Sequence, residues 1–580
     1  MKILQIFFNN FFCNIGPTLA NSIKSPRSKS FTDYLKQNIL SSFLFDTITT
    51  ETTAKIINNL KPKSSSGHDN LSSIQLKFIS ADILNILTQI INQSLCTGIV
   101  PSSLKIAKIT PIYKKEDPHI TDNYRPISLL PVISKVLEKV VFLQLYDYFV
   151  KNKLLYDSQY GFRKLHSTEL AALEFTDKVF QNLNNGDLPV AIFLDLSKAF
   201  DTIDHSILLH KLNYYGIKGT ALNWFKNYLC NRTQFVEFND SHSSKSTIIT
   251  GVPQGSILGP LLFIIYMNDI AEVTNKFHFT LYADDTSLIE PICTFTSDLK
   301  NTTEATEAIN KELNFITDWL CLNKLSLNAK KTKMMIFHHR QRNISKLKLN
   351  LCINDTPIEQ VSEFNFLGIM LDECLTWNSH IQKIASKISS VNGTISRLKR
   401  FLPSEILKVI YNALIQPHLN YGILLWGKNT KRIFKLQKWA LRGITSSKYN
   451  AHTDPLFIQL KLLKVHDMYK LNCLKFYFKY HKHETPSYFD EMFATIYPSH
   501  NYETRQRDQP VVAGGNTSLT DSSLWFSLPR EIENTPQNIL DKLTTHSFAG
   551  YSNYIKQYFI SKYSPVCTIQ NCYICNRHTA

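Results

Sequence analysis

The chain has 580 residues, of which 43% are hydrophobic and 19% are charged. This balance is typical of folded proteins and excludes a chain that is disordered throughout; the length has room for three or four domains. The 64 lysine and arginine residues exceed the 47 acidic ones, so the net charge is +17. Such an excess favours a polyanionic partner, above all nucleic acid. No uninterrupted apolar run reaches eighteen residues, so we expect no membrane partner.

Residues 1–60 predict short helices on both sides of a polar stretch, and an apolar stripe near the start is best explained as core. The stripe consists of Phe7, Phe8, Phe11 and Phe12. Asn9 and Asn10 interrupt it, which argues against a signal peptide. The segment 60–69 is a basic, flexible turn rich in serine; a solvated linker and a nucleic-acid contact both remain open for it.

Residues 104–113 predict a strand that ends at Lys114 and Lys115, and Arg125 follows in an extended segment before a helix over 131–150. Lysines at a hairpin tip are usually solvated. The next helix is expected to run to Leu183 and to be capped by Ser167 or Thr168. Ahead of it, Gly161 suits a close backbone approach.

Val190–Leu194 is an apolar strand-like run that ends at Asp195 and leads to Phe200. Asp201, Asp204 and His205 fit an ordinary cluster at a helix N-terminus, and we expect none of them to be catalytic. The pattern over 208–232 is helical, with Trp224, Phe225 and Tyr228 on the packing face.

Residues 251–260 form a glycine-rich loop that opens an apolar helix over 260–269. After it, apolar residues alternate up to Tyr282 and resume after Asp285, which predicts a half-buried hairpin with Asp284 and Asp285 at its tip. Two adjacent carboxylates repel each other and resist desolvation. A solvated turn is the ordinary explanation, but rigidly held carboxylates also suit divalent metal ions, which cancel the repulsion.

The segment 325–332 precedes a strand over 334–337, and residues 377–480 are helical. Within them, residues 431–442 carry bases at helical spacing between apolar residues, which fits either a solvated face or phosphate contacts. Residues 500–523 read as a loop. The tail holds four candidate Zn²⁺ ligands, although a Cys-x₂-His pair at the extreme end is unusual: Cys567, Cys572, Cys575 and His578.

Three of these segments, in this order, resemble the reverse transcriptases of non-LTR, LINE-type (CR1/jockey-like) retrotransposons: Phe-Leu-Asp195-Leu-Ser-Lys-Ala-Phe200, Gly-Val-Pro-Gln254-Gly255-Ser and Tyr-Ala-Asp284-Asp285. A single four-residue match would be weak, whereas three in family order are strong. The resemblance covers about residues 55–450. It implies an α+β fold of the right-hand polymerase type, with fingers, palm, a helical thumb and a small C-terminal region.

The resemblance also implies roles for residues at matching positions. The catalytic carboxylates are Asp195, Asp284 and Asp285, which together with the carbonyl of Leu196 hold two Mg²⁺ ions (Mn²⁺ being an alternative). The nucleotide-binding set is Lys114, Arg125, Arg163, Phe200, Gln254, Gly255 and Lys331. Within it, Phe200 matches a steric gate against the 2′-hydroxyl, although a core phenylalanine is the plain alternative. The primer grip is Phe366, Leu367 and Gly368.

The expected organisation is an N-terminal extension and the start of the fingers over 1–94, fingers and palm over 95–371, the thumb over 372–480 and a C-terminal region over 481–580. Expected partners are an RNA template, a DNA primer or target site and deoxynucleoside triphosphates. An endonuclease is expected from a region upstream of this sequence. A nuclear or cytoplasmic ribonucleoprotein fits better than a secreted protein, because cysteines 13 to 473 show no disulfide-like spacing.

The main alternative is a catalytically inactive nucleic-acid-binding remnant of such an element. A second alternative is an RNA-dependent RNA polymerase, against which the position of Phe200 argues. RNA-directed DNA synthesis is the expectation that all three motifs support together.

Overall fold

A computed structural model describes residues 2–23, 29–36, 39–114, 117–238, 241–292, 299–342, 344, 347–496 and 523–566. Its strands are β1 (Ile106–Tyr113), β2 (Tyr124–Leu129), β3 (Leu188–Leu194), β4 (Arg232–Phe238), β5 (Ser241–His242), β6 (Ser246–Ile248), β7 (His278–Tyr282), β8 (Asp285–Ile292), β9 (Lys333–Ile336), β10 (Cys352–Ile353), β11 (Thr356–Pro357), β12 (Glu359–Gln360), β13 (Glu363–Phe366) and β14 (Ile369–Asp372).

Helices precede, separate and follow these strands, which makes the chain an α+β protein. In the first 270 residues they are α1 (Lys2–Ser22), α2 (Thr50–Asn59), α3 (Ser73–Thr97), α4 (Val132–Lys151), α5 (Thr168–Asn184), α6 (His205–Tyr214), α7 (Gly219–Leu229) and α8 (Gly259–Met267). The later ones are α9 (Leu299–Leu322), α10 (Asn378–Leu398), α11 (Ser404–Leu414), α12 (Gln416–Asn420), α13 (Ile423–Trp426), α14 (Lys431–Ile444), α15 (Asp454–Leu460), α16 (Val465–His481), α17 (Tyr488–Ile496), α18 (Leu524–Glu533), α19 (Gln537–Leu540), α20 (Lys542–Thr545) and α21 (Phe548–Ser561).

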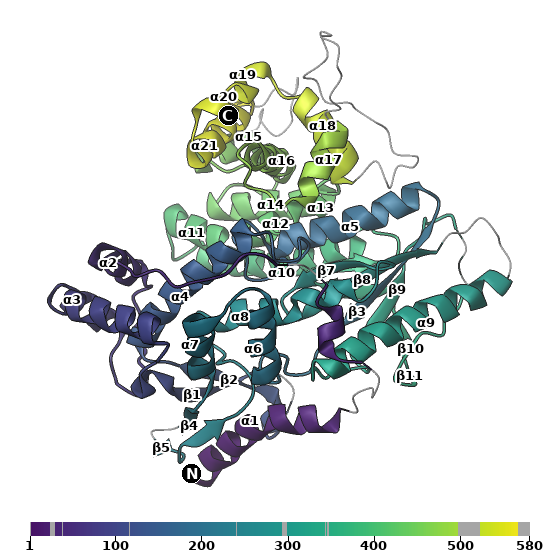
Figure 1. Ribbon diagram of the computed structural model, residues 1–580. Coiled ribbons are helices and arrows are strands. Elements are labelled where there is room, and N and C mark those ends of the chain that lie inside the picture. Colours follow the sequence, from purple (N-terminus) through teal and green to yellow (C-terminus); the bar gives the residue numbers. More distant parts are fainter. Residues whose placement is uncertain are drawn as a thin grey trace, which may run out of the picture.

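The central sheet has the order β12-β9-β3-β8-β7 and separates two hydrophobic cores (Figure 1). All seven residues of β3 are buried, and successive side chains of a strand point to opposite faces. Val190 and Ile192 therefore join the core that contains α6, α8 and α9. Ala191 and Phe193 join the core formed by α5 and the helices after residue 378. One strand thus contributes to both cores.

A second sheet, β2-β1-β4-β5 with β6 on β4, is covered by α1. Phe8 and Phe12 are buried between α1 and this sheet, and Gln5 donates a hydrogen bond to the Phe238 carbonyl oxygen at 2.8 Å. The predicted apolar stripe is correct for these two phenylalanines. Phe7, in contrast, is 58% exposed, because it lies on the outer side of the helix.

The sequence pattern predicted one helix over residues 208–232, but the structure has two. Two helices, α6 and α7, are separated by a turn at Gly216, whose φ of 90° ends α6, and β4 already begins at Arg232. Trp224, Phe225 and Tyr228 are buried as predicted.

The described chain from α10 onward is helical, and Figure 1 shows these helices stacked above the central sheet. α16 packs against α18 and α21 as well as against α13 and α14. Residues on both sides of position 480, for example Tyr469 and Tyr551, belong to the same core. The helices after β14 therefore share one hydrophobic interior.

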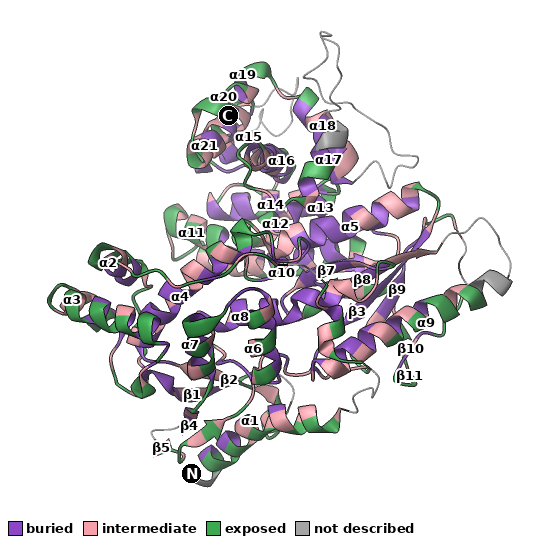
Figure 2. Ribbon diagram, in the orientation of Figure 1, coloured by how far each residue is buried: buried purple, intermediate pink, exposed green. Residues whose placement is uncertain are grey.

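Among the described residues, α3 is long and apolar enough to cross a membrane by length and composition. This helix has few charges, but polar residues interrupt it, so it contains no uninterrupted apolar run of eighteen residues. Leu76, Leu87 and Ile91 are nevertheless buried in the main core, against α2, α4 and α7. Its outer side stays exposed (Figure 2).

A buried ion pair ties α6 to the segment after α8. Lys211 Nζ lies 2.5 Å from Asp269 Oδ1, and both side chains are almost completely buried. Lys211 also donates to the Tyr266 carbonyl oxygen, while Trp319 Nε1 donates to Asp269 Oδ2 at 2.9 Å. Both charges therefore have several hydrogen-bond partners, as burial requires.

We expect Lys211→Met to lower the free energy of unfolding by about 3–5 kcal/mol, because Asp269 would keep a buried charge without its partner. The loss should shrink in the double variant Lys211→Met/Asp269→Asn, which removes both charges. Lys226→Met, at an exposed lysine of α7, is the control. Urea denaturation measures all three, and a Lys211→Met variant as stable as the control would show that the pair contributes nothing.

Candidate active site

Three carboxylates meet at the ends of adjacent strands in the central sheet. Asp195 directly follows β3, and β3 pairs antiparallel with β8 so that Leu194 lies opposite Thr286. This register places Asp195 next to Asp285. In the β7–β8 hairpin Tyr282 pairs with Asp285, so Asp284 lies in the two-residue turn. The structure thus brings together the three acids that the sequence motifs singled out.

The turn is held from outside by the segment that precedes α5. Ala283 has a φ of 58°, and its N–H donates to Gln159 Oε1 at 3.1 Å. The Gly161 N–H donates to the same oxygen at 2.8 Å. A Cβ on Gly161 would lie 2.3 Å from the Ala283 nitrogen. The close backbone approach predicted for Gly161 is therefore confirmed, and its partner is the carboxylate turn itself.

Beneath this turn lies Glu174 of α5, a functional residue that no sequence motif indicated. Its side chain is fully buried and accepts hydrogen bonds from Ser158 Oγ at 2.6 Å and from the Tyr160 hydroxyl. His278 Nε2 lies 2.8 Å away, which links β7 to the same carboxylate. Glu174 thus fixes the segment 158–161 and the hairpin relative to each other. In the sequence it is a plain polar residue within a helix pattern.

Asp195 is held from the other side by the segment before β9. The Asn328 N–H donates to the Asp195 carbonyl oxygen at 2.8 Å, and Leu196 pairs with Leu327. Thr332 Oγ1 faces the Asp195 N–H at 3.5 Å. Lys331 lies in this segment with its side chain exposed. The backbone of Asp195 is therefore fixed while its carboxylate remains partly accessible.

The carboxylates act on one another electrostatically. Desolvation, then repulsion from Asp284 and Asp195, raises the pKa of Asp285 to about 6, although its side chain reaches solvent. Desolvation followed by repulsion from Asp195 also raises the pKa of Asp284. Lys114 opposes both shifts, and Arg125 opposes that of Asp284. The site thus combines crowded negative charge with two cationic side chains from the second sheet.

This donor set fits a divalent cation. Oxygen ligands are those that Mg²⁺ and similar hard ions prefer, and a cation would relieve the repulsion that raises both pKa values. Within the described part of the chain, no three Asp, Glu, His or Cys side chains lie close enough to hold a metal ion. The three carboxylates therefore do not form a complete ligand set by themselves, and a cation held between them would need further ligands, such as the phosphate oxygens of a substrate.

Of the other predicted phosphate ligands, Lys114 and Arg125 face the site and Arg163 does not. Arg125 is an exposed residue of β2, paired with Ile112 in β1. Arg163 Nη1 instead donates to the carbonyl oxygens of Tyr156, Asp157 and Gln159 at 2.7–3.2 Å. Its guanidinium therefore organises the loop that supports the carboxylate turn.

Phe200 lies half-buried between two other aromatic rings. It stacks on Phe263 of α8 with ring centroids 4.4 Å apart, and Phe162 meets it edge-on at 6.1 Å. Its carbonyl oxygen accepts from the Val252 N–H at 3.0 Å, which ties it to the glycine-rich loop. Phe263 therefore packs against one face of the Phe200 ring, and part of the ring remains exposed to solvent.

The glycine-rich loop is fixed by two carboxylates, of which Glu138 is fully buried and Asp201 is half-buried. Gln254 Nε2 donates to both oxygens of Asp201 at 2.9 Å, and burial raises the pKa of Asp201 to about 6. Glu138 accepts from the Ile257 N–H at 2.6 Å and the Leu258 N–H at 3.3 Å. Asp204 caps α6 as predicted, but Asp201 does not belong to a helix N-terminus, because its side chain turns toward the loop. Distant partners of this kind leave no local signal in a sequence.

Gly255 adopts a φ of 127° where a Cβ would lie 2.6 Å from the Ser128 carbonyl oxygen. The Gln254 carbonyl oxygen in turn accepts from the Ser128 N–H at 2.8 Å. The loop therefore lies directly on β2. Gln254 and Gly255 join the second sheet to the neighbourhood of Phe200.

The hairpin that contains Phe366, Leu367 and Gly368 projects toward the C-terminal helices. Leu367 and Gly368 have φ values of 46° and 88°, as in a tight two-residue turn between β13 and β14. The Tyr421 hydroxyl contacts both the Leu367 carbonyl oxygen and Thr168 Oγ1. This hydroxyl links the hairpin tip to the start of α5. The four candidate zinc ligands Cys567, Cys572, Cys575 and His578 lie outside the described residues.

Comparison with known proteins agrees with this geometry. Residues 112–371 match the family described as "Reverse transcriptase (RNA-dependent DNA polymerase)". The chain is 29% identical over 458 residues to the probable RNA-directed DNA polymerase from transposon BS of Drosophila melanogaster, covering 75% of this chain and 49% of that protein. It is 28% identical over 480 residues to the RNA-directed DNA polymerase from mobile element jockey of the same species, covering 80% and 51%.

A third relative is the probable RNA-directed DNA polymerase from transposon X-element of Drosophila melanogaster, 25% identical over 450 residues, which are 74% of this chain and 47% of that protein. The chain spans about half the length of these curated relatives. All of them are polymerases of mobile elements, and the matched family range contains Asp195, Asp284 and Asp285. Residues 112–371 therefore resemble a reverse transcriptase domain, and the chain is similar over most of its length to RNA-directed DNA polymerases of mobile elements.

Proposed function

We propose that the chain is an RNA-directed DNA polymerase that copies the RNA of a non-LTR retrotransposon. The observation that carries the proposal is the joint placement of Asp195, Asp284 and Asp285 at adjacent strand ends, facing Lys114 and Arg125. A protein that only bound nucleic acid would need the basic surface but not three mutually repelling carboxylates. Its substrates are deoxynucleoside triphosphates, an RNA template and a DNA primer or target site.

In this assignment the central sheet is the palm, the sheet β2-β1-β4 belongs to the fingers, and the helices from α10 onward begin the thumb. The division at residues 94, 371 and 480 is part of the proposal, as is a zinc site formed by the tail. A ribonucleoprotein in the nucleus or cytoplasm is the matching cellular form. The hairpin at Leu367 and Gly368 would hold the primer end, because its tip is anchored to both α5 and Tyr421.

The chemistry requires a primer 3′-hydroxyl, a triphosphate and a path for the leaving pyrophosphate. The three carboxylates and the Leu196 carbonyl oxygen would hold two Mg²⁺ ions, which would supply activation of the hydroxyl and neutralisation of the leaving group. Lys114 and Arg125 orient the triphosphate, Arg through its planar fork. Lys331 would give a proton to pyrophosphate, a role supported by its exposed side chain and by its position in the segment that bonds to the backbone of Asp195.

We expect Asp284→Asn to reduce primer extension by about a thousandfold or more, because it removes a charge on which metal binding depends. Binding of an RNA–DNA duplex should stay nearly unchanged, since it is spread over many basic residues. Asp355→Asn is the control, because Asp355 also lies in a two-residue hairpin turn, between β10 and β11, and its side chain is exposed. Extension by purified Asp284→Asn within tenfold of the wild type would remove the catalytic assignment.

Phe200→Ala should admit ribonucleotides while deoxynucleotides are still incorporated, because the ring would no longer fill the space of a 2′-hydroxyl. The expected change in sugar selectivity is about ten- to a hundredfold. Phe200→Tyr keeps the ring and should keep the selectivity. Single-nucleotide incorporation of dTTP and UTP measures the sugar selectivity of each variant, and a melting curve measures its stability.

A stable Phe200→Ala protein that still rejects UTP like the wild type would disprove the gate. A variant that loses about 3–5 kcal/mol of stability and both activities together would instead identify Phe200 as a core residue.

The exposed bases of α14 give a prediction about salt. Lys431 and Lys435 are exposed, whereas the Arg442 guanidinium donates to the Ala451 carbonyl oxygen at 2.8 and 3.0 Å and so serves the helix end. Lys431→Gln/Lys435→Gln should lower the log–log salt slope of duplex binding by about one for each phosphate that is no longer neutralised. A Lys151→Gln/Lys226→Gln variant, with the same change of charge on α4 and α7, should not. Equal slopes for all three proteins would make α14 a solvated surface.

A further inference from the structure

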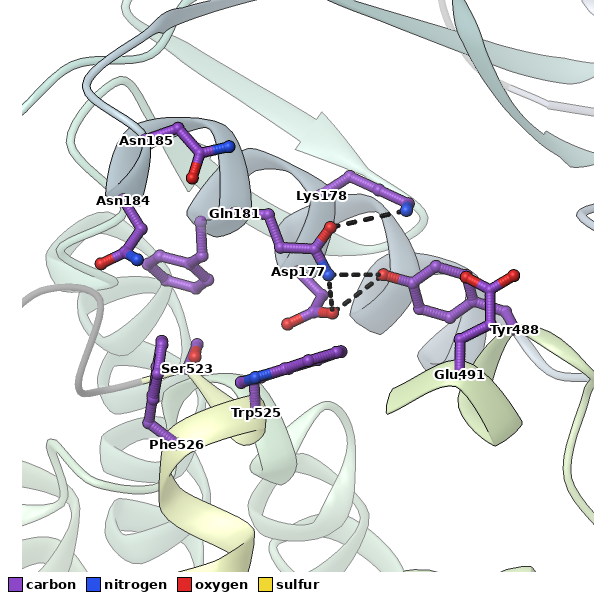
Figure 3. Close-up of a pocket in the computed structure, with 11 residues that line it drawn as sticks. Asp177, Lys178, Gln181, Asn184, Asn185, Tyr488, Glu491, Ser523, Trp525 and Phe526 are labelled. Carbon is purple, nitrogen blue, oxygen red and sulfur yellow. Dashed lines mark hydrogen bonds between the residues drawn. The ribbon is translucent and has the colours of Figure 1, made fainter. Parts of the chain in front are cut away.

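A cavity of about 350 Å³ lies between α5 and the C-terminal helices α17 and α18 (Figure 3). Its size falls within the range of small-ligand sites, roughly 300–1,000 Å³. It shares no residue with the carboxylate site. The lining residues are Asp177, Lys178, Phe180, Gln181, Asn184, Asn185, Tyr488, Glu491, Ser523, Trp525 and Phe526.

One side of the cavity is aromatic. Trp525 and Phe526 come from α18 and Phe180 from α5. Figure 3 shows the indole of Trp525 lying opposite Asp177 and Gln181, with the cavity between them. A half-buried indole offers a flat apolar face to a flat ligand, and such a ring can stack on any base, with a strength that differs among the bases.

The opposite side carries a buried acceptor without a donor. Asp177 is 4% exposed, and its Oδ2 accepts from the Tyr488 hydroxyl at 2.8 Å and from Gln181 Nε2 at 3.1 Å. Among the residues that the structure describes, its Oδ1 has no hydrogen-bond partner, and neither does the Oγ of Ser523, which is 3% exposed. Burial raises the pKa of Asp177 to about 6. Buried polar atoms are nearly always paired, so two orphans beside one cavity indicate a ligand that supplies N–H groups.

The lysine Lys178 lies at the edge of the cavity. Lys178 Nζ lies 4.9 Å from the centroid of the Tyr488 ring and 3.5 Å from Gln181 Oε1. Lys178 offers a phosphate one favourable contact at this edge; the carboxylates Asp177 and Glu491 also line the cavity, so a phosphate would have to lie beside Lys178. The ligand is therefore a flat aromatic ring with an N–H donor on its edge and a phosphate attached.

We propose that this cavity binds an unpaired purine base that carries an amino group, in a nucleotide or a single strand. The amino group donates to Asp177 Oδ1, the ring stacks on Trp525, and Lys178 faces the phosphate. Uracil lacks an amino group and stacks less well. The assignment does not rest on polymerase activity, although an enzyme that copies RNA would supply such a strand.

The first test uses the wild-type protein alone. Adenosine 5′-monophosphate should quench indole fluorescence on binding. Purine riboside 5′-monophosphate, which lacks only the amino group, should bind about tenfold more weakly because Asp177 Oδ1 stays unpaired, and uridine 5′-monophosphate should bind more weakly still. Equal binding of the three nucleotides, or binding of arginine amide in preference to them, would overturn the proposal.

Amino-acid substitutions in the protein and short oligonucleotides test the same proposal further. Asp177→Asn should weaken binding of adenosine 5′-monophosphate about tenfold, whereas Asp490→Asn, an exposed carboxylate on α17, should not. Trp525→Leu should abolish the quenching. Stronger binding of eight-nucleotide oligo(rA) or oligo(dA) than of the mononucleotide assigns the site to an RNA or DNA strand, and equal binding assigns it to a free nucleotide.

Primer extension by Asp177→Asn should equal that of the wild type, so a failure of this proposal is distinguishable from a failure of the polymerase assignment. If Asp177→Asn does not fold, the wild-type comparison of adenosine and purine riboside monophosphates still decides. No quenching by any nucleotide overturns the proposal.

Discussion

The antiparallel register between β3 and β8 is the constraint on which the rest of the site depends. It sets Leu194 opposite Thr286 and so brings Asp195 next to Asp285. Because side chains alternate along a strand, a slip of one residue would turn β3 inside out and would remove Asp195 from its partners. Burial of β3 on both faces prevents such a slip, since Val190 and Ile192 fill one core and Ala191 and Phe193 the other. The stability of the two cores thus fixes the geometry of the charges.

The repulsion among the acids is tolerated because their backbones are held by groups that take no part in it. Gln159 fixes the turn, Glu174 fixes the segment that carries Gln159, and Asn328 fixes Asp195. These hydrogen bonds lie behind the carboxylates. The carboxylate oxygens are consequently left to whatever cation or donor arrives in front of them, which is the arrangement that preorganised catalysis requires.

Local patterns in the sequence predict much of this fold, but few of the side-chain hydrogen bonds that join distant segments. A continuous apolar run predicted the strand before Asp195, and the polar break between two apolar segments predicted the hairpin that contains Asp284 and Asp285; the structure has both. The cap at Ser167 was also readable, because capping is decided within four residues. Three other features could not be predicted from the sequence: the role of Glu174, the hydrogen bond from Gln254 to Asp201, and the inward orientation of the Arg163 side chain. Each depends on which distant segment packs nearby, and hydrophobic periodicity carries no information about that.

The position of α1 has a consequence for synthesis of the chain. Its buried face packs on β4 and β6, and Gln5 bonds to a residue 233 positions later. A ribosome adds about 5–20 residues per second, so α1 waits roughly 10–45 s before its docking surface has been made. During that time Phe8 and Phe12 have nothing to cover them. The helix α1 therefore docks later than elements that pack on their neighbours in sequence, although before the helices from α10 onward are made, and in the interval its apolar face is a target for a chaperone.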